Sequence, residues 1–332
     1  MPYYGIPVGQ TSEDVGFAYN KDIITGMLRG KYGFEGVICS DWGLVTDLKM
    51  FGQLFKEASA WGVEHLSPEE RMLKLLDAGI DQFGGESNPD MLIKLVAEGK
   101  VSEARLDDSV RRLMLDKFRL GLFDNPYVDE KNVEKVVGNS AFVSAGKEAQ
   151  RRSMVLLKNA SMKGSPKTVL PITGRKRIYV ENVSPELAAQ YGEIVGSPEE
   201  ADLAIIRIVA PYYPHEGFLD SRFHSGDLDY KGEEKRRLQT IMETVPTIVD
   251  IYLDRAAVIP DIAESSTALT ANFGVTDELL LELLWGKYAP TGKLPFELPS
   301  SMQAVTAQLE DLPYDSENPL FPFGFGLTFS TN

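Results

Sequence analysis

The sequence predicts a two-part α/β protein, in which three βα units of the kind that build a parallel (β/α)8 barrel are followed by a second α/β unit with a mostly parallel sheet. In the first part, short apolar runs alternate with helical patterns at a spacing of roughly 35–45 residues, as in parallel βαβ crossovers. A polar segment rich in loop-forming residues then interrupts the alternation. The alternation resumes in the last half, where β-branched runs are flanked by helical segments.

Three strand–helix units are predicted within residues 1–124. Each candidate strand is a short run that is followed by one or two segments with apolar side chains at helical spacing. The strands cover Met1–Tyr4, Val37–Ser40 and Ile80–Phe83, and the helices cover residues 21–29, 68–79, 89–98 and 102–120. Because a complete barrel typically has eight units, either a second chain or copy supplies the missing strands or the local fold differs from this one.

The helix that starts at Pro68 has the clearest boundary signals. Ser67-Pro68-Glu69-Glu70 has the form of a capping box with proline at the first helical position. Apolar residues then recur on one face, and Gly79 ends the pattern. The next strand is ended by Gly84-Gly85.

Residues 125–167 are predicted to link the two parts. The turn-like Asp124-Asn125-Pro126 opens a polar stretch, which a helix at residues 141–152 and a short strand at residues 154–157 follow. A second loop, rich in Ser, Lys and Gly, ends this segment.

Residues 168–332 are predicted to form a second α/β unit, with a parallel or mostly parallel sheet. Its candidate strands cover residues 177–180, 203–208 and 247–253, and its clearest helices cover residues 233–242 and 277–284. The tail from Gly286 is rich in proline and glycine and is expected to be irregular.

The charge of the chain disfavours two classes of partner. The 332 residues carry a formal net charge of −15, which repels phosphate backbones and anionic membranes, whereas a neutral saccharide is not repelled. No stretch is long and apolar enough to span a bilayer. The residues after Met1 lack the basic region and apolar core of a signal peptide, and the compartment is left open.

The cysteine and histidine residues predict neither a disulfide nor a metal site. Cys39 is the single cysteine and lies in an apolar run, where a thiol usually acts as a small buried hydrophobe. His65, His215 and His224 do not have zinc-type spacing. We therefore expect no metal, and no cofactor is required by the chemistry considered below.

Asp41 is the leading candidate for a catalytic residue. The strand-forming run Gly36–Ser40 ends at Asp41, and the indole of Trp42 follows. In a parallel α/β barrel, chemistry lies on the loops just past the carboxyl ends of the strands. An acid beside an aromatic surface there suits the nucleophile of a sugar-cleaving enzyme. The alternative is that Asp41 caps a helix or starts a turn, as acids often do.

Five segments resemble glycoside hydrolase family 3 and follow one another in the order of that family. They are Gly36–Trp42, Ala78–Asp81, Arg152–Asn159, Pro290–Pro295 and Pro322–Leu327. The resemblance implies a (β/α)8 barrel followed by an α/β sandwich, with the last three βα units of the barrel at residues 1–124 and the α/β sandwich domain at residues 168–332 of this chain. It further implies an enzyme that acts on β-glycosides from the non-reducing end. It also implies that Asp41 is the nucleophile, that Trp42 forms a wall of the sugar subsite and that Tyr4 contacts the nucleophile region.

The family's paired Lys-His, its Gly-His and its early sugar-binding aspartate have no counterpart in this sequence. We therefore expect half of the sugar pocket to be missing from this chain. On this interpretation the chain is a fragment or a subunit of a glycosidase.

Glu216 is the candidate acid/base residue. In the family this residue comes from the second domain, often from a Gly-Glu-Gly-x-Asp-Arg-like loop after a strand, and here residues 203–208 are followed by a loop that contains His215-Glu216-Gly217. The match departs in length and lacks the first glycine, so Asp220 is an alternative. The chemistry needs a carboxylic acid that stays protonated near neutral pH. The other interpretation is that Glu216 is an exposed loop acid.

Three further residues are candidates for substrate contacts. Tyr213 and Phe218 lie in the same aromatic-rich loop, and sugars stack their C–H faces on such rings. The rings could instead anchor the loop by packing. Glu86 lies just past the third predicted strand and could bind a sugar hydroxyl, although an acid at a helix N-terminus is the simpler interpretation.

The sequence therefore predicts a retaining, exo-acting β-glycosidase, with β-glucosidase as the preferred activity and a carbohydrate as the substrate. Specificity for β-xylosides or α-arabinofuranosides stays open, because most of the residues that select the sugar are missing. An alternative from a different functional class is a non-catalytic sugar-binding or structural subunit that works only with a partner chain.

Overall fold

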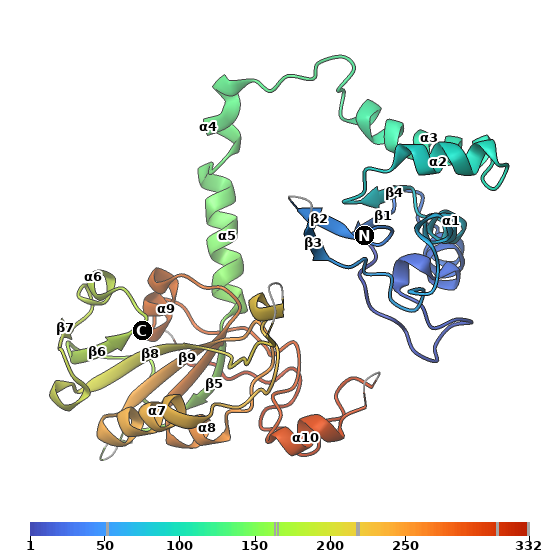
Figure 1. Ribbon diagram of the computed structural model, residues 1–332. Coiled ribbons are helices and arrows are strands. Elements are labelled where there is room, and N and C mark those ends of the chain that lie inside the picture. The colour runs from blue at the N-terminus through green and yellow to red at the C-terminus, as the bar shows by residue number, and fades with distance from the viewer. Residues whose placement is uncertain (51–52, 163, 165, 217–219, 310–311, 331–332) are drawn as a thin grey trace. The chain divides into compact units, whose positions relative to one another are not determined.

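Two structural units make up the chain, Met1–Glu130 and Lys131–Asn332 (Figure 1). The structure is a computed structural model that describes residues 1–332 except 51–52, 163, 165, 217–219, 310–311 and 331–332. No described helix is both long and apolar enough to cross a membrane.

The first unit has more helix than strand among its regular elements and contains one small parallel sheet. Strands β1 and β4 flank helix α1 and pair in parallel, with Cys39 opposite Gln82 and Trp42 opposite Gly84. The other strands form an antiparallel pair, β2 with β3. The elements are η1 (Phe17–Tyr19), the π-helix η2 (Asp22–Lys31), β1 (Cys39–Trp42), β2 (Leu48–Met50), β3 (Gln53–Lys56), α1 (Pro68–Ala78), β4 (Gln82–Gly84), α2 (Pro89–Ala97) and α3 (Glu103–Arg119).

Helix α1 follows its predicted boundaries because its end signals are local. The Ser67 hydroxyl accepts from the Glu70 amide, and the Glu70 carboxylate accepts from the Ser67 amide at 2.8 Å, which completes the capping box. Gly79 ends the helix at φ 110°, a backbone conformation that glycine adopts without a Cβ clash. The helix buries Met72, Leu75 and Leu76 in the core of the first unit.

One strand predicted for the first unit is wrong. Met1–Tyr4 is not a strand, because its backbone has no described ladder partner, and the chain is instead held there by the Phe17 amide, which donates to the Gly5 carbonyl at 3.0 Å. The helix predicted at residues 21–29 is present, as the π-helix η2 (Asp22–Lys31). The two parallel strands also lie about two residues later than predicted, at β1 and β4.

The second unit is built on a six-stranded sheet with the order β5-β10-β9-β8-β6-β7. Strands β6 to β10 pair in parallel, whereas β5 at the edge runs antiparallel to β10. This mixed α/β fold with a mostly parallel sheet confirms the predicted fold class of the second part. The strands are β5 (Val155–Asn159), β6 (Arg177–Glu181), β7 (Glu193–Ile194), β8 (Leu203–Val209), β9 (Thr247–Tyr252) and β10 (Ala268–Asn272).

Helices cover both faces of this sheet (Figure 1). Alternate residues of β8 point to opposite faces, so that Ala204 and Ile206 pack with α7 and α8, while Leu203 and Ile205 pack with α9. Strands buried on both faces need nearly continuous apolar sequences, as β8 has. The helices of this unit are α4 (Val133–Val136), α5 (Ser140–Ser153), α6 (Pro185–Ala188), α7 (Gly232–Thr244), α8 (Pro260–Ser265), α9 (Asp277–Leu284) and α10 (Met302–Ala307).

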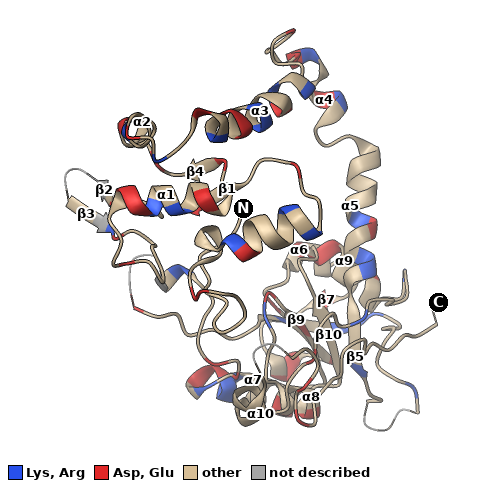
Figure 2. Cartoon of the chain, turned by 90° about the vertical axis from the view of Figure 1, so that its right-hand side faces the viewer, with Lys and Arg blue, Asp and Glu red and all other residues tan. Residues whose placement is uncertain are grey.

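Charged residues of the second unit belong mainly to the helices and loops around the sheet (Figure 2). Helix α7 shows the pattern, since it exposes Glu233 and Arg236 and buries Leu238 and Ile241 against the strands. The sheet itself contains one fully buried acid, Asp250 of β9, among its described residues. Its carboxylate is paired with Arg207 of β8 at 2.9 Å and accepts hydrogen bonds from Thr270 and Asn272.

Candidate active site

Asp41 lies at the carboxyl end of a parallel strand, as the sequence predicts. It is the third residue of β1, its side chain is half-buried, and its Oδ1 accepts a hydrogen bond from the Trp42 amide at 2.8 Å. The buried Ser40 hydroxyl accepts from the Gly84 amide and donates to the Asp41 carbonyl, at 2.8 and 2.9 Å. These bonds hold the backbone of Asp41 against β4 and leave its carboxylate partly open to solvent.

Tyr4 is brought to Asp41 by tertiary packing. Its hydroxyl donates to the Trp42 carbonyl at 2.8 Å and also interacts with the Asp41 carboxylate. Burial, and then the charge and hydrogen bond of Asp41, raise the pKa of Tyr4 above its ordinary value. The phenol therefore stays protonated at neutral pH and remains a hydrogen-bond donor. Lys56 Nζ lies 4.7 Å from the centre of the Tyr4 ring, and Trp61 packs beside that ring.

Trp42 is positioned by two glycines at the end of β4. A Cβ placed on Gly85 would lie 2.4 Å from Cδ1 of Trp42, and one placed on Gly84 would lie 2.8 Å from Cε3. The indole therefore packs directly on this stretch of backbone, while 56% of the residue stays exposed. An aromatic ring with one supported face and one open face suits contact with the C–H surface of a ligand.

Replacement of Gly85 by alanine is expected to displace the indole of Trp42. Gly85 has φ +67°, and its Cβ would overlap the ring, so we expect a loss of about 1–2 kcal/mol in the free energy of unfolding of the first unit. Gly33→Ala is the matched control, because Gly33 has φ +65° and nothing within 4 Å of the added Cβ. Near-ultraviolet circular dichroism should change for Gly85→Ala and not for Gly33→Ala, and equal spectra would contradict the packing described here.

Glu86 holds the loop after β1 through both of its carboxylate oxygens. Oε1 accepts from the amides of Val45 and Thr46 at 2.8 and 3.0 Å, and Oε2 accepts from the Thr46 hydroxyl and the Asn88 amide group at 2.7 and 2.9 Å. Since a carboxylate has about four acceptor positions, a sugar hydroxyl would have to displace one of these donors. The contacts are not those of a helix N-terminal acid, because α2 begins at Pro89 with Asn88 as its N-cap.

A buried acid that the sequence analysis did not select supports the start of β1. The Asp81 carboxylate accepts from the Ile38 amide, Ser109, Arg29 and Arg112 at 2.6–2.9 Å, and its side chain is completely buried. Burial by itself would raise the pKa of Asp81, but these hydrogen bonds and the Arg112 charge outweigh it and hold the pKa below its usual value. Asp81 belongs to one of the five resembling segments, and that was its only signal in the sequence.

Cys39 is half-buried, which corrects the prediction of a buried apolar thiol. It lies at the first position of β1, where burial alternates along the strand: Ser40 is buried, whereas Cys39 and Asp41 are half-buried. Burial raises the pKa of its thiol.

Glu216 lies in the loop that leaves the carboxyl end of β8 in the second unit. Its side chain is exposed, as the alternative interpretation of a loop acid also expects. Asp220 begins the short turn Asp220–Arg222 of the same loop, and the predicted contact Phe218 lies outside the described residues. Tyr213 donates from its hydroxyl to the Asp229 carbonyl at 3.0 Å, and Lys231 lies 5.3 Å from its ring, so this ring has packing partners already.

A crevice of about 330 Å³ lies at the carboxyl ends of the parallel strands of the second unit. It is lined by Asn182 after β6, Arg207 and Val209 of β8, Tyr252 of β9 and Asn272 of β10. This is the place where the strand order of a doubly wound sheet changes direction, and such sheets bind ligands there. The loop with Glu216 starts at this crevice.

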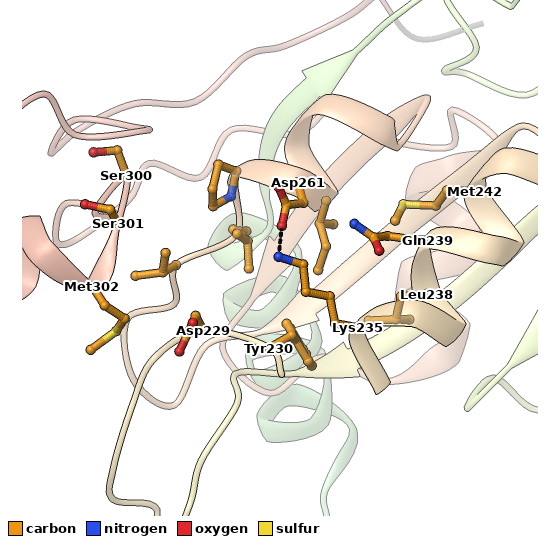
Figure 3. A pocket seen from close by; sticks show the side chains of 14 residues that line it. Asp229, Tyr230, Lys235, Leu238, Gln239, Met242, Asp261, Ser300, Ser301 and Met302 are labelled. Carbon is orange, nitrogen blue, oxygen red and sulfur yellow. Dashed lines mark ion pairs between the residues drawn. The ribbon is translucent and has the colours of Figure 1, made fainter. Parts of the chain in front are cut away.

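Another pocket of the second unit, of about 290 Å³, lies between α7, α8 and the start of α10 (Figure 3). Lys235 and Asp261 form an ion pair across it, and Asp229, Tyr230, Ser301 and Met302 line another part of its wall. None of the predicted site residues lines it. Among the described residues, no group of three His, Cys, Asp or Glu side chains is placed to hold a metal ion.

The structure is that of a mixed α/β protein with a candidate acid near the carboxyl end of a parallel strand in each unit. Asp41 lies at the end of β1, and Glu216 lies in the loop that follows β8. Residues 10–115 match the glycosyl hydrolase family 3 N-terminal domain, and residues 188–329 match the family 3 C-terminal domain. The chain belongs to glycoside hydrolase family 3, and this confirms the resemblance described above.

Curated relatives of this chain include fungal and bacterial proteins. Beta-glucosidase C of Emericella nidulans is 47% identical, and the alignment covers 100% of this chain and 53% of the relative. Probable beta-glucosidase C of Aspergillus flavus is 49% identical over 99% of this chain and 52% of the relative. Periplasmic beta-glucosidase/beta-xylosidase of Dickeya chrysanthemi is 41% identical over 96% and 50%. The chain thus spans about half the length of the curated relatives it matches.

Solved structures support the fold. Beta-glucosidase from Listeria innocua in complex with isofagomine has a TM-score of 0.72 and 22% sequence identity to this chain, covering 95% of this chain and 50% of that one. At this level of identity the similarity concerns the fold alone.

Proposed function

We propose that this chain is part of a retaining, exo-acting β-glycosidase, with β-glucosidase as the preferred activity. Asp41 carries the proposal: a carboxylate at the carboxyl end of a parallel strand, beside a neutral Tyr4 hydroxyl and the open face of Trp42. Family membership and relatives named as beta-glucosidases support the same reaction class. The Dickeya relative is also named a beta-xylosidase, so xylosides are the second substrate class to test.

The proposed domain organisation follows the same family. Residues 1–124 form the C-terminal part of a (β/α)8 barrel, residues 125–167 form the linker, and residues 168–332 form the α/β sandwich domain. The parallel pairing of β1 with β4 across α1 supports the barrel assignment, since that arrangement is one βαβ unit. The missing barrel strands would come from a second chain or copy, or from a longer form of this protein.

The reaction proceeds in two steps that exchange bonds at the anomeric carbon. An Asp41 carboxylate oxygen attacks that carbon and forms an ester, while the glycosidic bond breaks and Glu216 transfers its proton to the departing oxygen. In the second step Glu216 takes a proton from water, whose oxygen attacks the anomeric carbon and releases Asp41. Retaining chemistry of this kind requires the two carboxyl groups to lie about 5–5.5 Å apart in the assembled site. No metal or cofactor takes part.

Hydrolysis of 4-nitrophenyl β-glucoside by the purified full chain tests the proposal. A 2-deoxy-2-fluoro-glucoside with a good leaving group should then leave a stable glucosyl ester on the peptide that contains Asp41, which mass spectrometry locates. A label on another carboxylate would reject Asp41 as the nucleophile.

The second candidate function is a non-catalytic sugar-binding or structural subunit. Two observations favour it: the described first unit has a single pair of parallel strands, and the chain spans half the length of its relatives. This function predicts that the full chain binds gluconolactone without hydrolysing aryl glucosides. Turnover by the chain alone would eliminate it.

Replacement of Glu216 by alanine should produce a loss that depends on the leaving group. A phenyl glucoside needs a proton on its departing oxygen, so kcat/KM should fall about 10²–10⁴-fold. A 2,4-dinitrophenyl glucoside leaves without that proton, and its loss should stay below about tenfold. Asp220→Ala is the matched variant: if it shows the pattern and Glu216→Ala does not, the acid/base role belongs to Asp220.

A further inference from the structure

The loop that carries Glu216 is long, and its two ends join β8 and α7. It runs from the end of β8 to the start of α7, which begins at Gly232. The described part of this loop contains one short 3-10 helix, Asp220–Arg222, and long loops with so little regular structure are usually functional. A side chain that transfers a proton must be held to within about 0.5 Å of its productive position. Something must therefore restrain the limbs of this loop.

The two limbs contact each other directly. On the limb that leaves β8, the Tyr213 amide donates to the Ser225 carbonyl of the returning limb at 2.7 Å. Gly226 allows this approach, because a Cβ there would lie 2.6 Å from the Tyr213 carbonyl oxygen. Glu216 lies in the part of the loop that this contact closes.

His224 and Asp254 fasten the closed limbs to the sheet. The His224 ring stacks on the Tyr212 ring, with a centroid distance of 3.7 Å and an angle of 7° between the planes, so it holds the outgoing limb. Its Nδ1 contacts the Asp254 carboxylate. Asp254 follows β9, whose residues 247–251 are buried in the centre of the sheet. The Asp254 side of these contacts is therefore attached to a well-packed strand.

Neighbouring backbone contacts extend the same attachment. Arg255 donates from Nη2 to the Gly226 carbonyl at 2.7 Å, and the Val258 amide donates to the Leu228 carbonyl at 2.8 Å. The connection from β9 to α8 thus holds the returning limb at three places. His224 is the residue that joins this connection to the outgoing limb, through Tyr212.

We infer that His224 and Asp254 form a clamp that fixes the loop carrying Glu216, and that both are positioning residues for the acid/base step. This inference rests on the proposed function, because the clamp serves catalysis only through the acid/base role of Glu216. Neither residue is required to touch the substrate. The clamp comprises Tyr212, His224 and Asp254, and it acts by holding the two limbs against β9.

Hydrogen exchange of the full chain tests the clamp without any need for activity. His224→Phe keeps a ring on Tyr212 and removes the nitrogen that contacts Asp254, and Asp254→Ala removes the other partner. Each should speed amide exchange in the peptides with Tyr213 and Val258 by roughly tenfold, because those bonds lose their anchor. Asp261→Ala is the control, since Asp261 is an acid of the same unit that pairs with Lys235. Exchange that is unchanged in both clamp variants, or equally raised by the control, would overturn the inference.

The double variant His224→Phe/Asp254→Ala shows whether the two residues act together. If the two residues form one clamp, amide exchange in the double variant should be no faster than in either single variant. Additive increases would mean that they act independently and would contradict the clamp.

Leaving-group dependence separates positioning of the acid/base residue from general loosening. His224→Phe should lower kcat/KM for phenyl β-glucoside on the order of tenfold and leave that for 2,4-dinitrophenyl β-glucoside within about threefold. Equal losses on both substrates would reject the positioning role. If the unmodified chain hydrolyses neither substrate, the proposed function fails, whereas the exchange experiment still decides whether the clamp exists.

Discussion

Asp41→Asn should lower kcat/KM for aryl β-glucosides on the order of 10⁴-fold or more, because a carboxamide is neutral and does not form the glycosyl ester. The fold should be unaffected. Asparagine has nearly the same shape as aspartate. Its side-chain oxygen can still accept the hydrogen bond that the Trp42 amide donates to Asp41 at 2.8 Å. Initial rates with 4-nitrophenyl β-glucoside, together with circular dichroism of the same samples, measure both effects.

Asp47→Asn is the matched control for this change. Asp47 is an exposed acid of the same loop region and accepts the Ala58 amide at 2.9 Å, so the substitution removes an equal charge without reaching β1. Activity should stay within about threefold of the unmodified chain. The nucleophile role is untenable if Asp41→Asn retains full turnover, or if both variants lose activity equally.

Asp81→Ala should destabilise the first unit by about 3–5 kcal/mol, which is the expected cost of removing one partner from a buried ion pair. The substitution leaves Arg29 and Arg112 without the buried carboxylate that now balances them. It also takes the acceptor from the Ile38 amide, at the residue just before β1. Asp41 is three residues further along, so its position should be lost along with the stability.

The stability of each unit has to be measured separately, because two units do not share one free energy of unfolding. Hydrogen exchange under increasing urea, resolved by peptide, provides that measurement. The loss should be confined to residues 1–130, while peptides of the sheet in residues 131–332 keep their protection. Asp77→Ala is the control, since its ion pair with Lys21 is exposed and should contribute less than about 1 kcal/mol. A comparable effect of the two variants would show that the Asp81 network does not hold the unit together.

Elements with local signals were predicted well. Helix α1 has a capping box, an apolar stripe and a terminal glycine within thirteen consecutive residues, 67–79, and each of these acts on its immediate neighbours. Helix α9 has the predicted bounds Asp277–Leu284 because its run of leucines is enclosed by acids at the start and a glycine shortly after the end. In both cases the deciding interactions lie within a few residues of one another.

Strands β6, β8 and β9 lie within one residue of their predicted bounds, because each has a β-branched, apolar sequence of its own. Other elements that depend on distant partners were predicted poorly. Strand β10 (Ala268–Asn272) was missed, because its short sequence becomes a strand only between β9 and β5. The same pairing makes β5 antiparallel, which its own residues do not indicate. The prediction for Met1–Tyr4 was wrong in the opposite way, because a strand was predicted where none forms. This segment has no neighbouring strand to pair with among the described residues.

The sequence by itself determined which chemical groups are present and near which strand each one lies: an acid and an indole at the end of β1, and a second acid in the loop after β8. Only the tertiary structure decided which donors those acids meet. Glu86 is occupied by Val45, Thr46 and Asn88, Tyr4 reaches Asp41 across 37 positions, and His224 reaches Asp254 across 30. The physical reason is that hydrogen bonds and ion pairs act over about 3–4 Å, so their partners are set by how distant segments pack.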